Sequence, residues 1–258
     1  MKKIILGSIL TIINFSAWSA CSYIFDATEQ DLRDTNEFPA SFTVFPTTSD
    51  KLSFKTELSL SKSYVALSKT TLNRMEINRN ESWLIDGDKN LPSNGIIAYE
   101  LKIKVPEIIN PESGLRMFPS LIGTRMENGD IFGISPDYMR EGQRNEFLID
   151  AVIRGKNDQS FDGISFKPQK NTDGYQNIGV YMNQNTQQIG IISNGVNHGY
   201  IYTYPSKLKN IYFLFMATHG NIISSDINKE FSIELVTEAT KLKNDYPTGT
   251  TDICGTKI

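Results

Sequence analysis

An alternating row of aromatic side chains is the part of this sequence best suited to recognise a ligand. His198, Tyr200, Tyr202 and Tyr204 have equal parity, so one extended strand would place all four on the same face. Rings that carry a polar group make contact surfaces for sugars or peptides at low entropic cost. The row therefore predicts a ligand-binding face, with a purely structural sheet face as the alternative.

Two carboxylates come nearest to a catalytic pair. Glycosidases hold two acids about 5 to 5.5 Å apart to retain configuration and about 6.5 to 9.5 Å apart to invert it. Glu146 and Asp150 are four positions apart in an extended segment, which puts them on one face but roughly 13 Å from each other. We expect both to be solvent-facing charges, and an enzyme would need a further acid from another strand.

Other catalytic patterns are missing from the sequence. It contains no Gly-x-Ser-x-Gly segment, no His-Glu-x-x-His segment and no phosphate-binding glycine loop. Asp86, Asp88 and Asn90 could offer oxygens to calcium, but Leu91 and Ile97 stand where an EF-hand requires Gly and Glu. We predict a protein that is not an enzyme and needs no cofactor, with calcium at these three residues as the alternative to an ordinary turn.

The two cysteines, Cys21 and Cys254, stand near the ends of the chain that remains after the first twenty residues. A disulfide between them in an oxidising compartment would use both thiols and bring the two ends together. The alternative is lipidation of Cys21, because Trp18-Ser19-Ala20-Cys21 matches a lipobox except at Trp18.

The first twenty residues read as a signal peptide. Lys2 and Lys3 precede an apolar stretch, 4–15, which is too short to span a bilayer. Their removal changes the net charge from −3 to −5, which argues against nucleic-acid binding because that requires basic groups on phosphates. We expect an exported protein, periplasmic or extracellular, without a transmembrane segment after cleavage; an outer-membrane lipoprotein is the alternative.

Residues 21–258 are predicted to form one all-β domain, an antiparallel β-sandwich of the jelly-roll, concanavalin-A-like type. Short runs of β-branched and aromatic residues are separated by turns such as Asn94-Gly95 and Asn194-Gly195. In 99–105 the apolar residues alternate with Glu100, Lys102 and Lys104, so this strand should cover a core on one side only. Segments 26–33 and 236–244 are expected as short helices, and 67–77 is ambiguous.

The segment from Ile178 to Gly199 predicts three consecutive antiparallel strands with a polar turn at 183–186 and an Asn-Gly turn at 194–195. With Gly95-Ile-Ile-Ala-Tyr-Glu-Leu-Lys-Ile103 upstream, it resembles the signature of SPRY-type domains and related concanavalin-A-like jelly rolls. The whole chain also resembles an uncharacterised secreted family of Gram-negative bacteria, a domain of unknown function. That resemblance implies a compartment and no chemistry.

Three functions remain open on the sequence alone. The first is a non-catalytic binding module, lectin-like or protein-binding, whose partner would be a glycan or an envelope protein. The second is a secreted carbohydrate-active enzyme with acids from different strands. The third is a structural envelope protein without a ligand.

Overall fold

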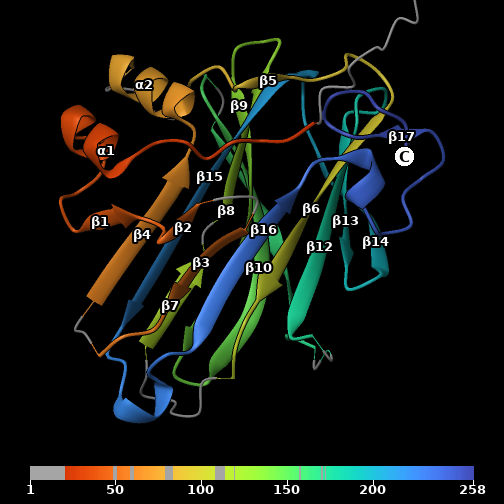
Figure 1. Ribbon diagram of the computed structural model, residues 1–258. Coiled ribbons are helices and arrows are strands. Elements are labelled where there is room, and N and C mark those ends of the chain that lie inside the picture. Colours follow the sequence, from red (N-terminus) through yellow and green to blue (C-terminus); the bar gives the residue numbers. More distant parts are fainter. Residues whose placement is uncertain are drawn as a thin grey trace, which may run out of the picture.

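The computed structural model describes residues 21–48, 51–58, 61–78, 84–107, 114–118, 120–156, 158–169, 171 and 173–258. The predicted signal peptide, residues 1–20, lies outside these ranges. Within them, the chain forms two β-sheets packed face to face and two α-helices beside one sheet (Figure 1). The predicted antiparallel β-sandwich is confirmed.

Sheet A has the strand order β1-β4-β15-β7-β9-β10-β11, with β5 and β8 also paired to β15. Its strands are β1 (Phe42–Val44), β4 (Ser61–Leu67), β5 (Lys89–Asn90), β7 (Gly114–Phe118), β8 (Ser120–Met126), β9 (Ile131–Glu141), β10 (Arg144–Arg154), β11 (Gln159–Phe166) and β15 (Leu208–Gly220).

Sheet B has the order β14-β13-β12-β6-β16-β3-β2, with β17 paired to β6. Its strands are β2 (Thr47–Thr48), β3 (Lys51–Lys55), β6 (Ile96–Lys104), β12 (Tyr175–Asn183), β13 (Gln188–Ser193), β14 (Val196–Thr203), β16 (Glu230–Val236) and β17 (Thr250–Thr251). The consecutive strands β12, β13 and β14 are the predicted antiparallel run.

The main core lies between the sheets and follows the alternation of the strands. From sheet B, Tyr99, Leu101 and Ile103 point inward, and from sheet A, Phe213 and Phe215 meet them; all five are fully buried. Tyr99 and Phe213 pack edge to face with ring centres 5.3 Å apart. Each such side chain contributes about 1.5 to 3 kcal/mol by leaving water, so this contact holds the two sheets together.

The outer face of β6 corrects one prediction. Glu100 was expected to face solvent, yet its exposed fraction is 0%. The chain after β16, residues 237–258, is called the C-terminal tail below, and Lys243 and Asn244 within it cover this position. Strand β6 is therefore covered on both faces, which its alternating sequence does not indicate.

Two of the helical predictions need correction at their boundaries or in kind. Helix α1 (Glu29–Thr35) begins later than expected, because Thr28 and Asp31 form a capping box at its start. The ambiguous segment contains helix α2 (Lys69–Ile77) with Ser68 as its N-cap. The helix predicted over 236–244 is wrong: β16 runs to Val236, and only a short 3-10 turn, Ala239–Lys241, follows. The backbone N–H groups of Lys243 and Asn244 donate to Glu100 of sheet B and not to a preceding helical turn.

The two helices cover part of the outer face of sheet A. Leu32 of α1 and Leu72 of α2 are buried in one apolar cluster with Val65 of β4 and Tyr212 of β15. In Figure 1 these helices and the C-terminus lie on opposite sides of the molecule. Each sheet therefore has its own cover.

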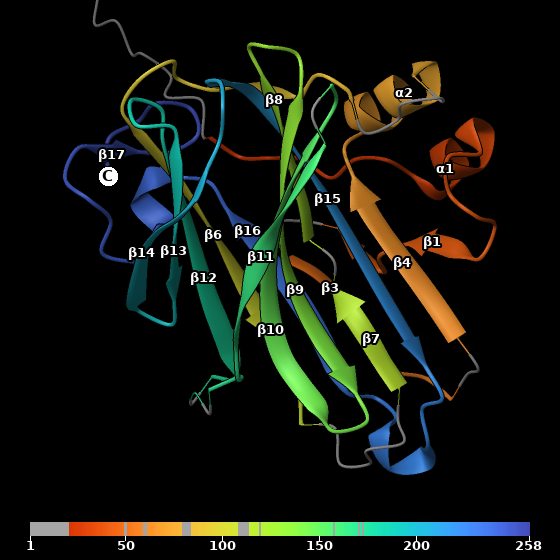
Figure 2. The same ribbon diagram turned by 180° about the vertical axis from the view of Figure 1, so that it is seen from behind.

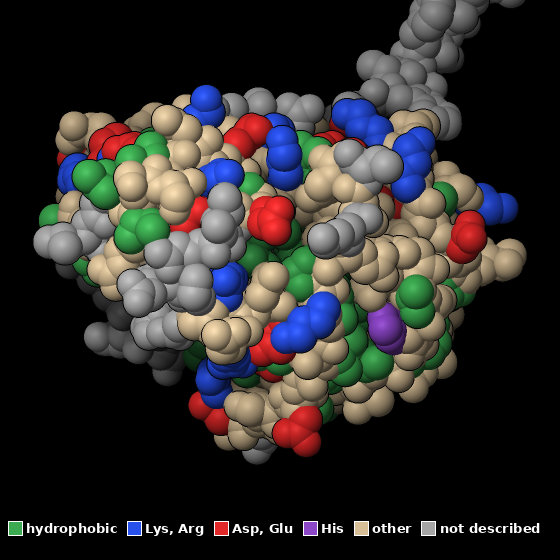
Figure 3. Space-filling view, turned by 90° about the horizontal axis from the view of Figure 1, so that it is seen from below, with side chains coloured by type: hydrophobic (Ala, Val, Ile, Leu, Met, Phe, Trp, Pro, Cys, Tyr) green, Lys and Arg blue, Asp and Glu red, His purple; other side chains and the backbone are tan. Residues whose placement is uncertain are grey.

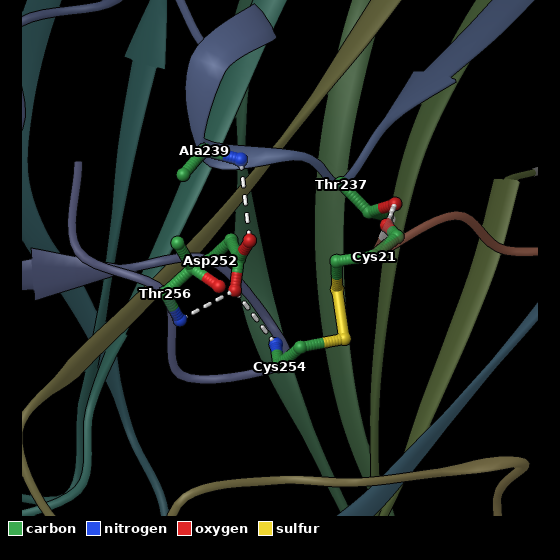
Figure 4. Close-up of a disulfide and its surroundings, with 6 residues drawn as sticks. All are labelled: Cys21, Thr237, Ala239, Asp252, Cys254 and Thr256. Atoms are coloured by element: carbon green, nitrogen blue, oxygen red, sulfur yellow. Dashed lines mark hydrogen bonds between the residues drawn. A yellow bond between two sulfur atoms is a disulfide. The ribbon is translucent and has the colours of Figure 1, made fainter. Parts of the chain in front are cut away.

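The disulfide between Cys21 and Cys254 confirms the predicted pairing. It joins residues 233 positions apart in sequence, with their Cα atoms 5.9 Å apart. Figure 4 shows its surroundings: the Thr237 hydroxyl donates to the Cys21 carbonyl, and the Asp252 carboxylate accepts backbone N–H groups, including that of Cys254. A sulfur held in this bond has no thiol left to carry a lipid.

No helix in the described part of the chain is both long enough and apolar enough to span a membrane. On the face shown in Figure 3, lysine and arginine side chains lie among aspartate and glutamate side chains.

Candidate ligand-binding site

The predicted aromatic row does not form one face. Tyr202 and Tyr204 are 4% and 3% exposed and pack in the core between the sheets. The Tyr202 hydroxyl donates to the Ile149 carbonyl at 2.6 Å, and burial raises the pKa of Tyr202 to about 12. Tyr204 donates to the Asn183 carbonyl at 2.9 Å. These two rings are structural, so the prediction that they bind a ligand is wrong.

Irregular pairing between β13 and β14 breaks the row. Gly190 pairs with Tyr200, but the neighbouring Ile189 pairs with Tyr202, and a second shift follows between Gly190 and Ile192. Gly199 has a φ of 72° at this point, which glycine adopts at little cost. Each extra residue in β14 changes the direction of the side chains that follow. Parity along the sequence therefore fails as a guide here.

Tyr200 and His198 are exposed, and their side chains contact different residues. Tyr200 is 38% exposed; its ring lies 5.2 Å from the ring of Tyr181, and its hydroxyl accepts a hydrogen bond from Asn183 Nδ2 at 3.0 Å. His198 Nε2 is hydrogen bonded to Ser193 Oγ at 2.7 Å. Only Tyr200 of the four predicted residues belongs to the outer face of sheet B.

A polar pocket of about 720 Å³ lies on that same outer face, where β6 ends and β12 begins. Amide side chains make up half of its lining residues. They are Gln169, Asn171, Asn177, Asn194 and Asn244.

The remaining lining residues add charge and one aromatic ring: Lys102, Asp173, Tyr175, Gly195 and Lys243. Five separate segments contribute to the pocket. They are β6, the β11–β12 connection, β12, the β13–β14 turn and the C-terminal tail. Because these segments meet only in the folded chain, no local motif marks the site.

Strand register and a buried glutamine position the pocket. Asn177 of β12 pairs with Lys102 of β6, so both side chains point outward side by side. Gln176, which is 2% exposed, accepts from Asn194 Nδ2 at 2.9 Å and donates to the Gln169 carbonyl at 2.7 Å. It thereby joins the β13–β14 turn to the β11–β12 connection, and the two walls are held at a fixed spacing.

The third wall is the tail, which is held by Glu100. Glu100 Oε1 accepts the backbone N–H groups of Lys243 and Asn244, both at 2.7 Å, and Asn244 Nδ2 at 3.0 Å. The Tyr246 hydroxyl donates to the same oxygen at 3.2 Å. The other carboxylate oxygen accepts from Asn177 Nδ2 at 3.5 Å. The buried carboxylate thus connects the pocket floor to the tail.

Three lysines in or beside the pocket are paired with acids of β16. Lys102 lies 3.3 Å from Glu234, and both Lys51 and Lys104 reach Glu230, at 3.0 and 3.1 Å. Hydrogen bonds from these two lysines lower the pKa of Glu230. Of the two lysines that line the pocket, Lys102 is balanced by Glu234, and Lys243 is accompanied by one lining acid, Asp173. These four charges sum to zero, so the pocket suits a neutral polar ligand better than a polyanion.

The candidate calcium ligands are used within the protein. The Asp88 carboxylate accepts the hydroxyls of Tyr23, Ser68 and Thr71. Asp86 accepts from Asn210 Nδ2 at 3.3 Å, while Asn90 belongs to β5 and pairs with Asn210. Asp88 thus serves as a buried anchor for the chain that follows Cys21, and calcium at these residues stays a prediction.

One further group of close ligand atoms consists of Cys21, Asp252 and Cys254. Both sulfurs are in the disulfide, and a metal would require thiolates.

The two carboxylates singled out in the sequence lie four residues apart on one strand, as expected. Glu146 and Asp150 both lie on β10 and are partly exposed; Glu146 contacts Arg144 and Lys167 at 2.9 and 3.6 Å. Asp137 of β9 lies nearer to Asp150 than Glu146 does, because Asp150 pairs with Ser135, two positions before Asp137. Figure 2 shows β9 and β10 on the side of the molecule nearer to the viewer.

Comparison with known protein families shows to which family the chain belongs. The model of a family described as "Domain of unknown function (DUF4882)" matches residues 2–130 and 148–256. The chain belongs to this family. The expected resemblance to a domain of unknown function is confirmed, and the narrower SPRY-type assignment stays a prediction.

Solved structures with some likeness to this chain include proteins of different kinds. One is the legume lectin-like domain from Entamoeba histolytica, with a TM-score of 0.42 and 14% identity over 74% of this chain and 87% of that one. Another is porphyranase B from Zobellia galactanivorans, with a TM-score of 0.42 and 10% identity over 77% and 82%. No curated protein matches the sequence.

Proposed function

We propose that the protein is an exported, non-catalytic module that binds a neutral glycan in the polar pocket on the outer face of sheet B. The observation that carries the proposal is the pocket itself, a space of about 720 Å³ with amide side chains from four segments on its walls. The disulfide is consistent with export, since such bonds persist in oxidising compartments.

Amide side chains suit the hydroxyl groups of a sugar. Each amide offers two N–H donors and a carbonyl acceptor, and a hydroxyl can serve as either partner. Tyr175 adds an aromatic surface with a polar tip to the same pocket. Because Gln176 and Glu100 fix the walls, little ordering is required on binding, which favours affinity.

The test is a binding screen against immobilised neutral and acidic glycans. It is followed by titration calorimetry with soluble cello-, malto- and chitin-oligosaccharides, using wild type and Asn171→Ala/Asn177→Ala. Two lost hydrogen bonds are each worth about 0.5 to 1.5 kcal/mol, so we expect affinity to fall about tenfold.

The control variant is Asn73→Ala, at an exposed position of helix α2, and it should bind like wild type. Low sensitivity to salt is also expected, because the site is neutral. A screen without any bound glycan, or equal binding by wild type and the pocket variant, would contradict the proposal.

A second candidate function, carbohydrate cleavage, rests on Asp137 and Asp150. They lie diagonally across the β9–β10 pair, which places such neighbours about 7 to 8 Å apart, within the range for inverting glycosidases. Burial raises the pKa of Asp150, whereas Asp137 Oδ1 accepts a hydrogen bond from Ser135 Oγ at 2.6 Å. The two environments would suit an acid and a base, respectively.

This candidate is tested by release of reducing ends from soluble polysaccharides by wild type, Asp137→Asn and Asp150→Asn. If the protein cleaves carbohydrate, the wild type should release reducing ends. Each substitution should abolish this activity and leave thermal stability unchanged. Glu146→Gln, on the same face of β10, is the matched control and should retain activity. No release by the wild type would remove this candidate.

A further inference from the structure

We infer that the glycan bound in the polar pocket is an extended chain, whose far end contacts Tyr200 at a second subsite on the edge strand β14. The inference rests on the proposed function and specifies the length of the ligand. It depends on the path between pocket and Tyr200, on the fixed position of that ring, and on the exposure of the residues between them.

The first step is the spacing along β12. Asn177 in the pocket and Tyr181 point outward from the same strand, four residues apart. At about 3.3 Å per residue, their Cα atoms are roughly 13 Å apart. Tyr200 packs against Tyr181. A ligand that contacts both Asn177 and Tyr200 must therefore be longer than one sugar ring.

The direct route over β12 is closed by the tail. Gly179 lies between Asn177 and Tyr181, and a Cβ built there would come within 2.6 Å of the Tyr246 hydroxyl and 2.7 Å of Asn244 Nδ2. The tail is therefore in close contact with the strand at this point. A ligand that leaves the pocket toward Tyr200 has to pass on the other side, along the β13–β14 hairpin.

The hairpin offers that route. Gly195 lines the pocket and Asn197 follows it on β14; both are exposed, as is Tyr200. Asn197 Oδ1 accepts the Tyr181 hydroxyl at 2.9 Å, so its amide is held in place beside the route with its nitrogen as a donor. Polar and aromatic groups thus follow each other from the pocket to the sheet edge.

Tyr200 is held in place before any ligand arrives. Its ring packs edge-on against Tyr181, with an interplanar angle of 61°, and its hydroxyl accepts Asn183 Nδ2. Tyr181 in turn lies directly over Gly190, where a Cβ would come within 2.0 Å of its ring. A fixed, partly exposed ring makes contact at a small entropic cost. This is the property required of an outer subsite.

The experiment measures affinity against ligand length. Chitin and cellulose oligomers of one to six units are titrated into wild type, Tyr200→Ala and Tyr200→Phe. We expect wild-type affinity to rise at least tenfold between the dimer and the hexamer. Tyr200→Ala should lose that rise and keep the affinity for the dimer, while Tyr200→Phe, which retains the ring, should keep most of the rise.

Val196→Ala, at an exposed position of the same strand, is the matched control and should behave like wild type. Binding that does not depend on length, or a loss in Tyr200→Ala that is equal for dimer and hexamer, overturns the extended-chain inference and leaves the pocket proposal intact. If neither oligomer series binds and the glycan screen is also blank, the proposed function and this inference both fail.

Discussion

The outer faces of the two sheets are covered in different ways. On sheet A, the helices contact β4 and β15 through a cluster of apolar side chains that includes Leu72. On sheet B, the C-terminal tail adds Leu242 and Tyr246 to a smaller apolar cluster, and hydrogen bonds to the carboxylate of Glu100 hold it as well. Apolar side chains pack without gaps, whereas the hydrogen-bonded part of the tail leaves the amide of Asn244 at the margin of the cover. The polar pocket lies at that margin, so the kind of cover determines where a polar ligand can bind.

Removal of the disulfide should have the largest effect. Cys21→Ser/Cys254→Ser opens a closed loop of nearly the whole described chain, and such a loss typically costs about 2 to 5 kcal/mol of folding free energy. Urea unfolding followed by far-UV circular dichroism measures this loss of folding free energy. Because Cys254 is in the tail, glycan binding should weaken as well. An unchanged unfolding midpoint would contradict the assignment of the bond as a stabilising one.

Truncation of the cover of sheet A should come next. Leu72→Ala leaves a cavity beneath α2, and such changes cost about 2 to 5 kcal/mol. Under conditions in which the variant is folded, its glycan affinity should equal that of wild type, because the pocket lies on the other sheet. The exposed neighbour Asn73→Ala should change stability by less than about 0.5 kcal/mol. Weakened glycan binding by folded Leu72→Ala would break the comparison.

Glu100→Gln tests the cover of sheet B. Replacing the carboxylate weakens charge-assisted hydrogen bonds to the tail, each worth about 1.5 to 3 kcal/mol; because an amide oxygen still accepts, we expect a net loss of about 2 kcal/mol. Unlike Leu72→Ala, this variant should also lose glycan affinity, since one of the two oxygens to which Asn177 and Asn244 donate becomes an N–H donor. Glu107→Gln, at an exposed position, is the control. Full affinity in Glu100→Gln would show that the tail does not shape the site.

The smallest effect concerns the core that both sheets share. His219 on β15 is fully buried, stacks on Phe54 with ring centres 5.4 Å apart, and has no hydrogen-bond partner for either ring nitrogen among the described residues. Burial lowers its pKa below the usual 6.5. As the pH falls through 6.5, this imidazole is protonated in the unfolded chain while it stays neutral in the folded chain. The free energy of unfolding therefore declines.

The change in the free energy of unfolding that His219 causes cannot exceed ~1.4 kcal/mol per pH unit, because one imidazole binds one proton. Comparison of urea midpoints between pH 7 and 5 for wild type and His219→Phe measures the effect. The substituted protein should show a flatter pH dependence. Equal slopes would mean that other groups set the acid sensitivity.

The fold was predictable because the strand patterns are strong. Alternation over 99–105 and the Asn-Gly turn at 194–195 correspond to β6 and to the β13–β14 hairpin. The disulfide followed from an even number of cysteines near opposite ends of the chain. These features are local or depend on simple counting, so tertiary context did not alter them.

The site was not predictable in the same way. The exposure of Glu100 was misjudged because a segment more than 140 residues away covers it. Tyr202 was assigned to the wrong face because bulges in β14 leave no periodic signal. The richness of 169–195 in Asn and Gln was the one available hint of the pocket. Register, bulges and the path of the tail turn that hint into a site, and all three depend on the whole fold.

The link between Cys21 and Cys254 also decides how the molecule carries mechanical load. The Cα atoms of these two residues are 5.9 Å apart. A force applied at the two residues is carried by the disulfide bond and not by the strands between them. The hydrogen bonds of the sandwich would therefore stay unloaded under tension. Reduction would move the same force onto the hydrogen bond between Tyr23 and Asp88 and onto those between the tail and Glu100, beside the pocket.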